Sequence, residues 1–374
     1  MKIYYEDSLP YAQEFFAELG ECEVFSHRTV SAEQVADADI LLVRSTTKVN
    51  EALLHLNQQL QYVATATAGT NHMDFKYLES RGIAHGSAGG CNAVAVAEYV
   101  LSALFVMAEK LEWNLRTKVV GIVGAGHVGS ALQRKLEALG ISYKLCDPPL
   151  AATNDARRFV DLDEIMDCDV ITLHVPYIKE GEYQTQHMFD AKRLAQLTPR
   201  QVLINACRGD VVDNQAALEL LQQGKELKLV LDVWENEPTI NQQLVPYVQL
   251  ATAHIAGHTI EGKARGTEML YQQLCKRLGL PVNKQLSDYL PSPEPALLEL
   301  PLQESAEDVI RDLVLAVYDI AQDDLQFKAS IGEAEQFRYI RKHYPIRREF
   351  AALKVSAGNY AESKAIYALG FLRP

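Results

Sequence analysis

The chain has 374 residues, 48% of them hydrophobic, and a formal net charge of −13 at pH 7. This size and composition predict two or three domains with large apolar cores. The negative charge argues against nucleic acid as a partner, although it leaves room for a local basic pocket that binds a small anion. Six scattered cysteines without a C-x-x-C pair are typical of reduced thiols rather than of a disulfide framework or a metal site.

The start of the chain and its most apolar run indicate where in the cell the protein is expected. Residues 1–10 carry acidic side chains and no apolar core, so we expect no secretory signal. Residues 93–108 are interrupted by Glu98 and Ser102 and are shorter than a membrane-spanning helix, so we interpret them as a buried helix. We therefore expect a cytoplasmic protein that does not bind a membrane.

The first part of the chain, up to about residue 98, alternates strand-like and helical runs. In chain order the predicted elements are a strand at 2–5, a helix at 11–19, and strands at 40–43 and 61–66. This alternation predicts a small α/β domain, which we interpret as flavodoxin-like.

The next motif is the glycine-rich sequence G-A-G-H-V-G at residues 124–129. It follows a strand-like run and opens a helical one, and this context is what makes the motif a dinucleotide-binding fingerprint. Gly124 would allow the tight turn, and Gly126 would let backbone N–H groups approach a pyrophosphate. Gly129 would let the helix pack closely on the strand.

A second strand-like run, residues 142–146, ends at Asp147. At this point of a dinucleotide fold a carboxylate accepts hydrogen bonds from the adenosine ribose and repels a 2′-phosphate, so the sequence predicts NAD rather than NADP. The alternative is that Asp147 only begins the turn at Pro148 and Pro149.

Further strands are predicted at 119–123, 169–175, 202–206, 229–233 and 248–253. Together with the run before Asp147 they make six alternating units, which predict a doubly wound parallel sheet of the Rossmann type. Arg208, Glu237 and His254 each follow one of the last three strands. Open α/β sheets bind ligands beyond the carboxyl ends of their strands, so we expect these three side chains at a binding site.

The three residues supply what oxidation of a 2-hydroxy acid requires. His254 can take the hydroxyl proton, Arg208 can hold the carboxylate and the developing carbonyl, and a nicotinamide would accept the hydride. Glu237 would bond the second ring nitrogen of His254, fix its tautomer and stabilise the imidazolium. Any one of them alone would more often be a surface or structural residue.

After His254, a helical run at 261–278 predicts that the chain returns to the first domain, and several prolines between residues 281 and 301 punctuate a linker. Helices are predicted at 306–318 and 333–343. The expected domains are a discontinuous substrate domain (1–98 and 255–285), an inserted Rossmann domain (99–254) and a C-terminal α+β dimerisation domain (286–374). Five basic residues without an acid lie between Arg338 and Arg348. We interpret some of them, with Arg338 and Arg347 as the two candidates, as contacts for a substrate phosphate, made within one chain or across a dimer. The alternative is a solvated helix face.

Several phrases of the sequence resemble the D-isomer-specific 2-hydroxyacid dehydrogenases, in which Arg, Glu and His follow the dinucleotide fold in this order. They are VRSTTKVN, ATATAGTNH, GGCNAVAVAEYV, LCDPP, INACRGDVVDN, LDVWENEP and HIAGHTIEGKARGT. The similarity covers nearly the whole chain, and it implies an NAD-dependent homodimer that oxidises a phosphorylated 2-hydroxy acid.

The resemblance also implies roles for individual residues. Arg208 and Glu237 would be catalytic, with His254 as the proton acceptor. Ser45 and Thr67 would contact the substrate, and Arg44, which directly follows an apolar strand, is suited to an oxyanion. Besides the glycines of the turn, the NAD site would be lined by His127, Val128, Asp147, Val175, Ala206, Cys207, Arg208, Asp232 and Gly257, although packing is the commoner role for Cys207.

One position departs from the family. The residue after HIAG is usually Tyr and contributes to substrate binding, whereas this chain has His258, whose ring donor differs in reach and charge. Two rival functions stay open at this point. One is oxidation of 3-phosphoglycerate, which also joins a 2-hydroxy acid to a phosphate, and the other is an NAD-sensing binding protein of the corepressor type.

Overall fold

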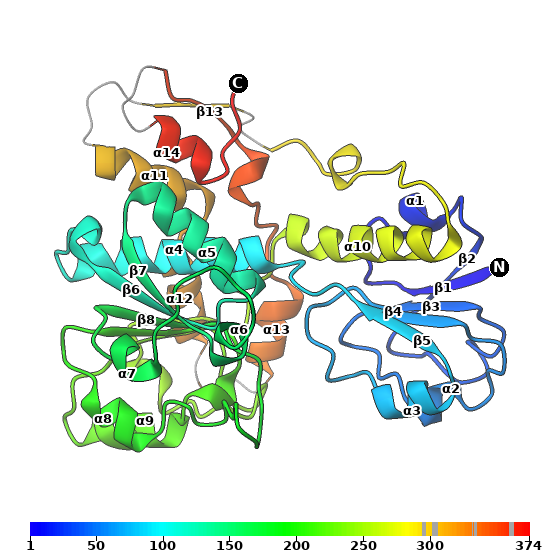
Figure 1. Ribbon diagram of the computed structural model, residues 1–374, viewed down its shortest axis with the longest axis horizontal. Coiled ribbons are helices and arrows are strands. Elements are labelled where there is room, and N and C mark those ends of the chain that lie inside the picture. Colours follow the sequence, from blue (N-terminus) through cyan, green and yellow to red (C-terminus); the bar gives the residue numbers. More distant parts are fainter. Residues whose placement is uncertain (294–296, 301–305, 331, 333–334, 359–362) are drawn as a thin grey trace. The chain divides into compact units, whose positions relative to one another are not determined.

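The structure is a computed structural model that describes residues 1–293, 297–300, 306–330, 332, 335–358 and 363–374 (Figure 1). The chain folds into two compact units, residues 1–92 with 259–291 and residues 93–258 with 292–374. The first boundary falls at residue 92 rather than at the expected 98, because one unbroken helix begins at Ala93. The C-terminal residues group with the second unit because their helices pack on that unit's own helices.

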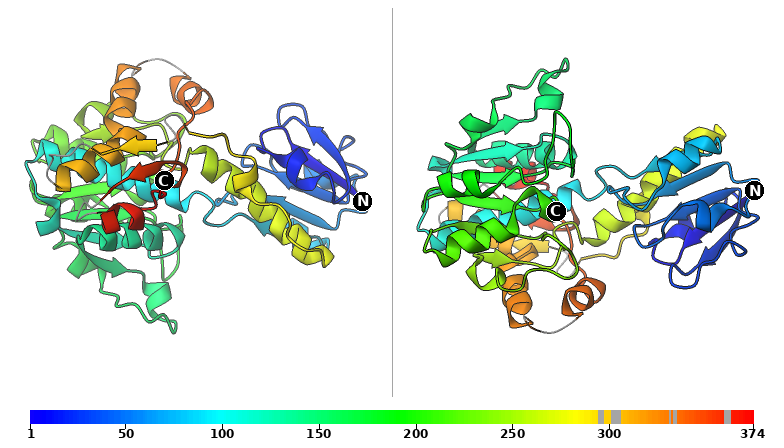
Figure 2. Two further views of the ribbon diagram at one scale, coloured as in Figure 1. Left: turned by 90° about the horizontal axis from the view of Figure 1, so that it is seen from above. Right: turned by 90° about the horizontal axis from the view of Figure 1, so that it is seen from below.

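The first unit contains a five-stranded parallel sheet with the order β2-β1-β3-β4-β5, which is the flavodoxin-like order. Its strands are β1 (Lys2–Glu6), β2 (Glu21–Phe25), β3 (Ile40–Val43), β4 (Tyr62–Thr65) and β5 (Ala84–Ser87). Its helices are α1 (Ala12–Phe16), α2 (Glu51–Leu54), α3 (Phe75–Ser80) and α10 (Ile260–Leu278). As expected, α10 returns to this unit and lies beside its sheet (Figure 2). Its residues Leu270, Tyr271 and Leu274 share an apolar core with Phe15 and Ile3.

The second unit contains a six-stranded parallel sheet with the order β11-β10-β9-β8-β6-β7. Its strands are β6 (Val119–Val123), β7 (Ser142–Cys146), β8 (Val170–Leu173), β9 (Val202–Asn205), β10 (Lys228–Leu231) and β11 (Leu250–Ala251). The strand order reverses at β6, which pairs with both β7 and β8. This is the topological switch point at which such sheets bind nucleotides, and the glycine-rich turn directly follows β6.

Helices cover both faces of this sheet (Figure 1). They are α4 (Ala93–Lys110) and α5 (His127–Leu139) on one face and α8 (Ala191–Gln196) and α9 (Asn214–Gln222) on the other, with the short α6 (Pro148–Ala151) and α7 (Leu162–Ile165). Within the described residues, no helix has both the length and the apolar character needed to cross a membrane.

The C-terminal segment, residues 292–374, contains helices and a small sheet, as expected of an α+β segment. Its elements are β12 (Leu297–Glu299), α11 (Ala306–Val317), α12 (Ile320–Ala329), α13 (Gln336–Lys342), β13 (Lys354–Ser356) and α14 (Ser363–Ala368). The predicted start of α13, residues 333 and 334, lies outside the described residues. Val309 and Leu313 of α11 and Ile366 of α14 join the apolar core that α4 and α5 build.

A buried ion pair ties this segment to α4 and α5. Lys135 Nζ donates to Glu98 Oε1 at 3.0 Å and to the Leu369 carbonyl at 2.7 Å, and Phe350 N donates to Glu98 Oε2 at 3.1 Å. Burial raises the pKa of Glu98 from 4.5 to about 7, although the charge of Lys135 opposes this rise.

This raised pKa predicts a pH-dependent stability. The folded state binds the proton of Glu98 more tightly than the unfolded state, so this contribution to stability is complete below the unfolded pKa and is lost as the pH rises through about 7. From roughly pH 5 to roughly pH 8, we expect the free energy of unfolding to fall by roughly 1–3 kcal/mol relative to that of Glu98→Gln. Urea denaturation of both proteins across that range measures the difference. Glu109→Gln, at an exposed position of the same helix, should keep the wild-type pH dependence. If the difference in free energy of unfolding between wild type and Glu98→Gln is the same at both ends of the pH range, the raised pKa of Glu98 is contradicted.

Candidate active site

The glycine-rich turn has the geometry that a bound pyrophosphate requires. Gly124 has a φ of 92°, and a Cβ there would lie 2.4 Å from the His174 carbonyl oxygen. A Cβ on Gly129 would lie 2.1 Å from the Gly124 oxygen, whereas nothing lies within 4 Å of a Cβ on Gly126. Gly126 caps α5, so the open space is at the amino end of a 13-residue helix, where backbone N–H groups and the helix dipole favour an anion.

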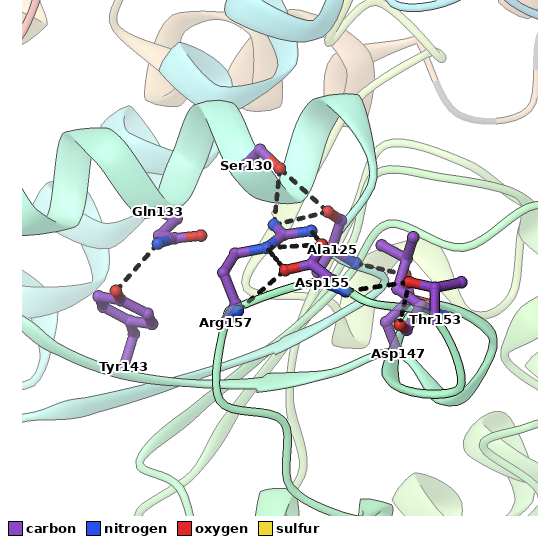
Figure 3. Close-up of polar contacts among 9 residues, drawn as sticks. Ala125, Ser130, Gln133, Tyr143, Asp147, Thr153, Asp155 and Arg157 are labelled. Carbon is purple, nitrogen blue, oxygen red and sulfur yellow. Dashed lines mark hydrogen bonds and ion pairs between the residues drawn. The ribbon is translucent and has the colours of Figure 1, made fainter.

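Asp147 holds this turn from the end of β7. Its Oδ2 accepts a hydrogen bond from Ala125 N at 2.8 Å, and its Oδ1 accepts one from Leu150 N at 3.0 Å (Figure 3). The second contact caps α6, so the alternative role of starting the turn at Pro148 is present as well. Each carboxylate oxygen retains acceptor capacity for a ribose hydroxyl, because a carboxylate accepts about four hydrogen bonds.

Arg157, which sequence reasoning missed, also contacts the turn. Its Nη1 donates to the Ala125 carbonyl and to Ser130 Oγ, both at 2.9 Å (Figure 3). Its other nitrogens form an ion pair with Asp155 at 2.6 Å, and these hydrogen bonds hold the pKa of Asp155 down at about 2. The nitrogens of the Arg157 guanidinium are therefore already bonded to Asp155, Ala125 and Ser130. A 2′-phosphate would have to compete with these partners.

These contacts predict that Asp147→Ala weakens NAD binding by about tenfold or more and narrows the preference for NAD over NADP, since hydrogen bonds to a charged acceptor contribute about 1.5–3 kcal/mol. Titration of both cofactors against wild type and variant measures the two affinities. Asp161→Ala is the matched control, because Asp161 caps the short helix α7 by accepting from Glu164 N at 2.8 Å and does not contact the turn. If Asp147→Ala discriminates between the cofactors as strongly as wild type, Asp147 does not contact the ribose.

His254 and Glu237 meet beyond the ends of β11 and β10. His254 Nδ1 lies 2.6 Å from Glu237 Oε2, and Glu237 Oε1 accepts from Trp234 N at 2.9 Å. The imidazole is 34% exposed, and among the described residues its Nε2 has no hydrogen-bond partner. His254 has a φ of 56°, a conformation that costs free energy for a residue with a Cβ and that is found at functional sites. The pair therefore leaves one imidazole nitrogen ready to exchange a proton.

Arg208 lies in the turn after β9. Its Nη1 donates to the Cys207 carbonyl at 2.7 Å, and Asn205 Nδ2 donates to the Arg208 carbonyl at 2.9 Å. A Cβ on the next residue, Gly209, would lie 2.0 Å from the Trp234 carbonyl oxygen. The segment that carries Arg208 thus packs directly on the segment that leads to Glu237.

The remaining residues predicted for the NAD site lie at the same edge of the sheet. Val175, Ala206 and Gly257 are half-buried and follow β8, β9 and β11, and His127 and Val128 begin α5. Cys207 is buried, and burial raises the pKa of its thiol to about 11, which fits a packing role. Asp232 is fully buried and accepts hydrogen bonds from Thr252, Ile255 and Ala256, so its carboxylate holds the loop around His254, and its contact with NAD stays a prediction.

The loop that carries the predicted substrate residues Arg44 and Ser45 is held by a buried carboxylate, Glu6, that the sequence did not point out. Glu6 accepts from Arg44 N at 2.9 Å, from Thr47 Oγ1 at 2.6 Å, and from the hydroxyls of Thr46 and Ser8. Burial works against the charged form, but these hydrogen bonds lower the pKa of Glu6 below its ordinary value. Ser45 is exposed, and within the described part of the chain its hydroxyl has no partner.

Two further predicted substrate residues have defined surroundings. Thr67 Oγ1 donates to the Gly69 carbonyl at 2.8 Å and lies 2.8 Å from Thr65 Oγ1. The His258 ring lies 5.9 Å from the ring of Tyr344, edge to face. The structure argues against a phosphate contact by Arg347 within its own chain, whereas a contact by the exposed Arg338, or by either residue across a dimer, stays a prediction. The Arg347 side chain is 5% exposed, and its guanidinium donates to the Ala256 and Ala95 carbonyls.

A second titratable cluster lies beside the Arg208 and Glu237 segments. His187 Nε2 lies 2.7 Å from Glu235 Oε1, and its Nδ1 lies 3.7 Å from Asp213 Oδ2. Burial opposes a charged imidazole, but the carboxylates, Glu235 first, raise the pKa of His187. The two ring nitrogens face different acids, so the geometry is that of a bridging ion pair rather than of one shared metal ion.

Comparison with known proteins agrees with this geometry. Residues 98–259 match the family described as the NAD binding domain of D-isomer specific 2-hydroxyacid dehydrogenases, and residues 289–370 match a domain of unknown function. The erythronate-4-phosphate dehydrogenase of Pseudoalteromonas atlantica is 66% identical over 100% of both chains, and that of Colwellia psychrerythraea is 47% identical over 99% of both.

Two solved structures share the fold at low identity. An acyclic imino acid reductase in complex with NADPH and D-Arg has a TM-score of 0.63 at 23% identity, covering 76% of this chain and 100% of its own. The NAD⁺-bound 3-phosphoglycerate dehydrogenase of Entamoeba histolytica has a TM-score of 0.62 at 22% identity, covering 76% of this chain and 99% of its own.

The fold and the matched cofactor domain define the class of NAD-binding D-isomer-specific 2-hydroxyacid dehydrogenases. Within that class, and over its full length, the chain belongs to the erythronate-4-phosphate dehydrogenase family.

Proposed function

We propose that this chain oxidises 4-phospho-D-erythronate to 2-oxo-3-hydroxy-4-phosphobutanoate with NAD, a step of pyridoxal 5′-phosphate biosynthesis. The observation that carries the chemistry is the 2.6 Å contact between His254 and Glu237, at the sheet edge where the glycine-rich turn fits a dinucleotide. The full-length relatives named for this activity support the choice of substrate.

Each of the three catalytic residues has its own role in this proposal. A bound NAD would supply the acceptor for the hydride of carbon 2 of the substrate. His254 takes the hydroxyl proton at Nε2, and Glu237 stabilises the resulting imidazolium through Nδ1. Arg208 orients the substrate carboxylate with its planar guanidinium. The proton would pass from His254 to solvent and the hydride would remain on the cofactor, so both bonds broken in the two-electron oxidation are accounted for.

The binding residues are proposed from their positions. The cofactor would be held by the glycine-rich turn with His127, Val128 and Asp147, and by the residues after the following strands, Val175, Ala206, Cys207, Arg208, Asp232 and Gly257. The substrate would be held by Arg44, Ser45, Thr67 and His258. Two observations support Arg44 and Ser45 in this role. Glu6 holds the backbone of Arg44 in place, and Ser45 is exposed.

We also propose a cytoplasmic homodimer that associates through the C-terminal segment. Large apolar side chains are exposed in and after α12 and α13, namely Leu325 (63%), Tyr339 (55%) and Ile346 (76%). Burying such surface against a second copy would stabilise an assembly. The cytoplasmic placement is supported by the six cysteines, all of which are free thiols in the structure.

The test is an assay of NADH formation with 4-phospho-D-erythronate and, separately, with 3-phosphoglycerate, each with and without a 2-oxoacid acceptor that could regenerate NAD. We expect turnover of the erythronate ester and a kcat/KM for 3-phosphoglycerate at least tenfold lower. The reverse order would make the chain a 3-phosphoglycerate dehydrogenase. Tight NAD binding without turnover of either acid would favour an NAD-sensing protein.

A further inference from the structure

The C-terminal segment covers the edge strand from which the catalytic loop emerges. Strand β11 is two residues long and lies at the edge of the six-stranded sheet. On its outer side, Asp324 Oδ1 of α12 accepts a hydrogen bond from Ala251 N at 2.7 Å, and Lys328 Nζ donates to the Val248 carbonyl at 2.8 Å. Asp324 and Lys328 also pair with each other at 2.8 Å. Side chains of α12 therefore satisfy backbone groups that a further strand would otherwise bind.

The loop after β11, residues 254–258, is held from two sides. From the sheet, Asp232 accepts from Ile255 N at 2.7 Å and from Ala256 N at 3.0 Å. From the C-terminal segment, Arg347 Nη1 donates to the Ala256 carbonyl at 3.1 Å. Both backbone groups of Ala256, two residues after His254, are thus fixed by charged side chains from different parts of the chain.

Arg347 is itself held in place. Its Nη2 donates to the Ala95 carbonyl in α4 at 2.7 Å, and its guanidinium lies 3.7 Å from the centre of the Tyr318 ring. The Tyr318 carbonyl in turn accepts from Ser102 Oγ of α4 at 2.8 Å. Burial raises the pKa of Asp323, which accepts hydrogen bonds from Tyr344 and Tyr318, while the charge of Arg347 opposes that rise. A planar guanidinium with two bonded nitrogens and a stacked face has little freedom to move.

We propose that the C-terminal segment acts as a clamp on the catalytic loop, with Arg347 as its positioning residue, which sets the place of His254 by fixing Ala256 against α4. This gives a role to a segment whose matched family is described only as a domain of unknown function. The role concerns turnover and is separate from association between two copies. It rests on the proposed function in one respect, namely that His254 is the base.

The expected effect follows from geometry. Removing the Arg347 side chain takes away its donor to the Ala256 carbonyl and its link from that residue to α4, which frees one side of the loop. A displacement of about 1 Å at a reacting group can lower the rate by about 10²-fold. For Arg347→Ala we therefore expect kcat to fall by about 10- to 100-fold, more than the KM for either substrate rises.

Arg311→Ala is the matched control. Arg311 is a partly exposed arginine on α11 of the same C-terminal segment, and its side chain pairs with Asp308 and with Asp312, both at 2.9 Å. We expect its kcat to stay within twofold of wild type. The mass of every variant by light scattering should equal that of wild type, so that a lost assembly is not mistaken for a displaced loop.

A readout without substrate is provided by Trp234. Its Nε1 donates to the Thr252 carbonyl at 2.9 Å, two residues before His254, and the chain has one other tryptophan, Trp113. In a Trp113→Phe background, Arg347→Ala should shift the Trp234 emission and speed deuterium exchange in residues 252–258, whereas Arg311→Ala should change neither.

The outcomes are distinct. Wild-type kcat and unchanged Trp234 emission in folded Arg347→Ala would overturn the clamp. If that variant does not fold, Arg347→Lys replaces it, because a lysine keeps the charge but cannot bridge the two carbonyls with a planar fork. An intermediate kcat with faster exchange in residues 252–258 is then expected, and wild-type values of both would overturn the proposal. If wild type does not oxidise 4-phospho-D-erythronate, the proposed function fails, and the emission and exchange data still decide whether Arg347 holds the loop.

Discussion

Replacing His254 with alanine is expected to lower kcat by about 10²- to 10⁴-fold, the usual contribution of a positioned base. The expectation rests on the free Nε2 of an imidazole whose Nδ1 is bonded to Glu237 at 2.6 Å. Steady-state kinetics with saturating NAD measure the loss. A His254→Ala protein that turns over at close to the wild-type rate would remove this residue as the base.

The control for His254 is its partner. Glu237→Gln keeps a hydrogen-bonding side chain of the same shape, but its one amide oxygen can accept from only one of Nδ1 and Trp234 N, and it loses the negative charge that stabilises the imidazolium. We expect this variant to retain more activity than His254→Ala and to differ from wild type in the pH dependence of kcat/KM. NAD affinity should be close to wild type in both variants, because neither side chain belongs to the glycine-rich turn.

Replacing Arg208 with alanine is expected to lower kcat/KM by about 10²- to 10³-fold, the typical loss when one placed donor to a developing charge is removed. The reason is that Arg208 would orient the carboxylate next to the reacting carbon. Kinetics at varied 4-phospho-D-erythronate measure the change.

Two comparisons sharpen the Arg208 test. Arg208→Lys retains the charge without the planar fork, so it should recover only part of the activity. Arg200→Ala, an exposed arginine just before β9, should behave like wild type. Equal losses in Arg208→Ala and Arg200→Ala would indicate a general effect of charge rather than a contact with the substrate.

The sequence predicts the central strands β3 and β6 well because most of their residues are buried. Both begin and end at the predicted residues, and in β3 all four residues are buried. The edge strand β7 also has the predicted bounds, although its first three residues are at least partly exposed. The edge strands β2 and β5 were missed, since most of their residues are at least partly exposed and lack an apolar run. Helix α12 was missed for a different reason. Its charged residues Asp324 and Lys328 bond to backbone groups in and next to β11. The polar residues of this helix therefore do not all lie on its exposed side, and the sequence lacks the apolar and polar faces by which a helix is recognised.

In the candidate site, too, some residues could be predicted from the local sequence and others could not. His254, Glu237 and Arg208 follow apolar runs, which places them at one edge of a predicted sheet without knowledge of any contact. Glu6, Arg157 and Arg347 act through partners far away in the sequence; Arg347 and Ala95, for example, are 252 residues apart. Nothing in the local sequence distinguishes such a residue from an ordinary surface charge.

The loop around Glu6 has a consequence for the entropy of binding. Ser45, Thr46 and Thr47 are three consecutive hydroxyl residues, yet one buried carboxylate engages only the second and third of them, together with the backbone of Arg44. The loop is therefore held in place without a ligand, and Ser45 stays exposed. Each side chain that must be immobilised on binding costs about 0.5–1.5 kcal/mol, so an incoming oxyanion meets a loop whose ordering cost was met during folding.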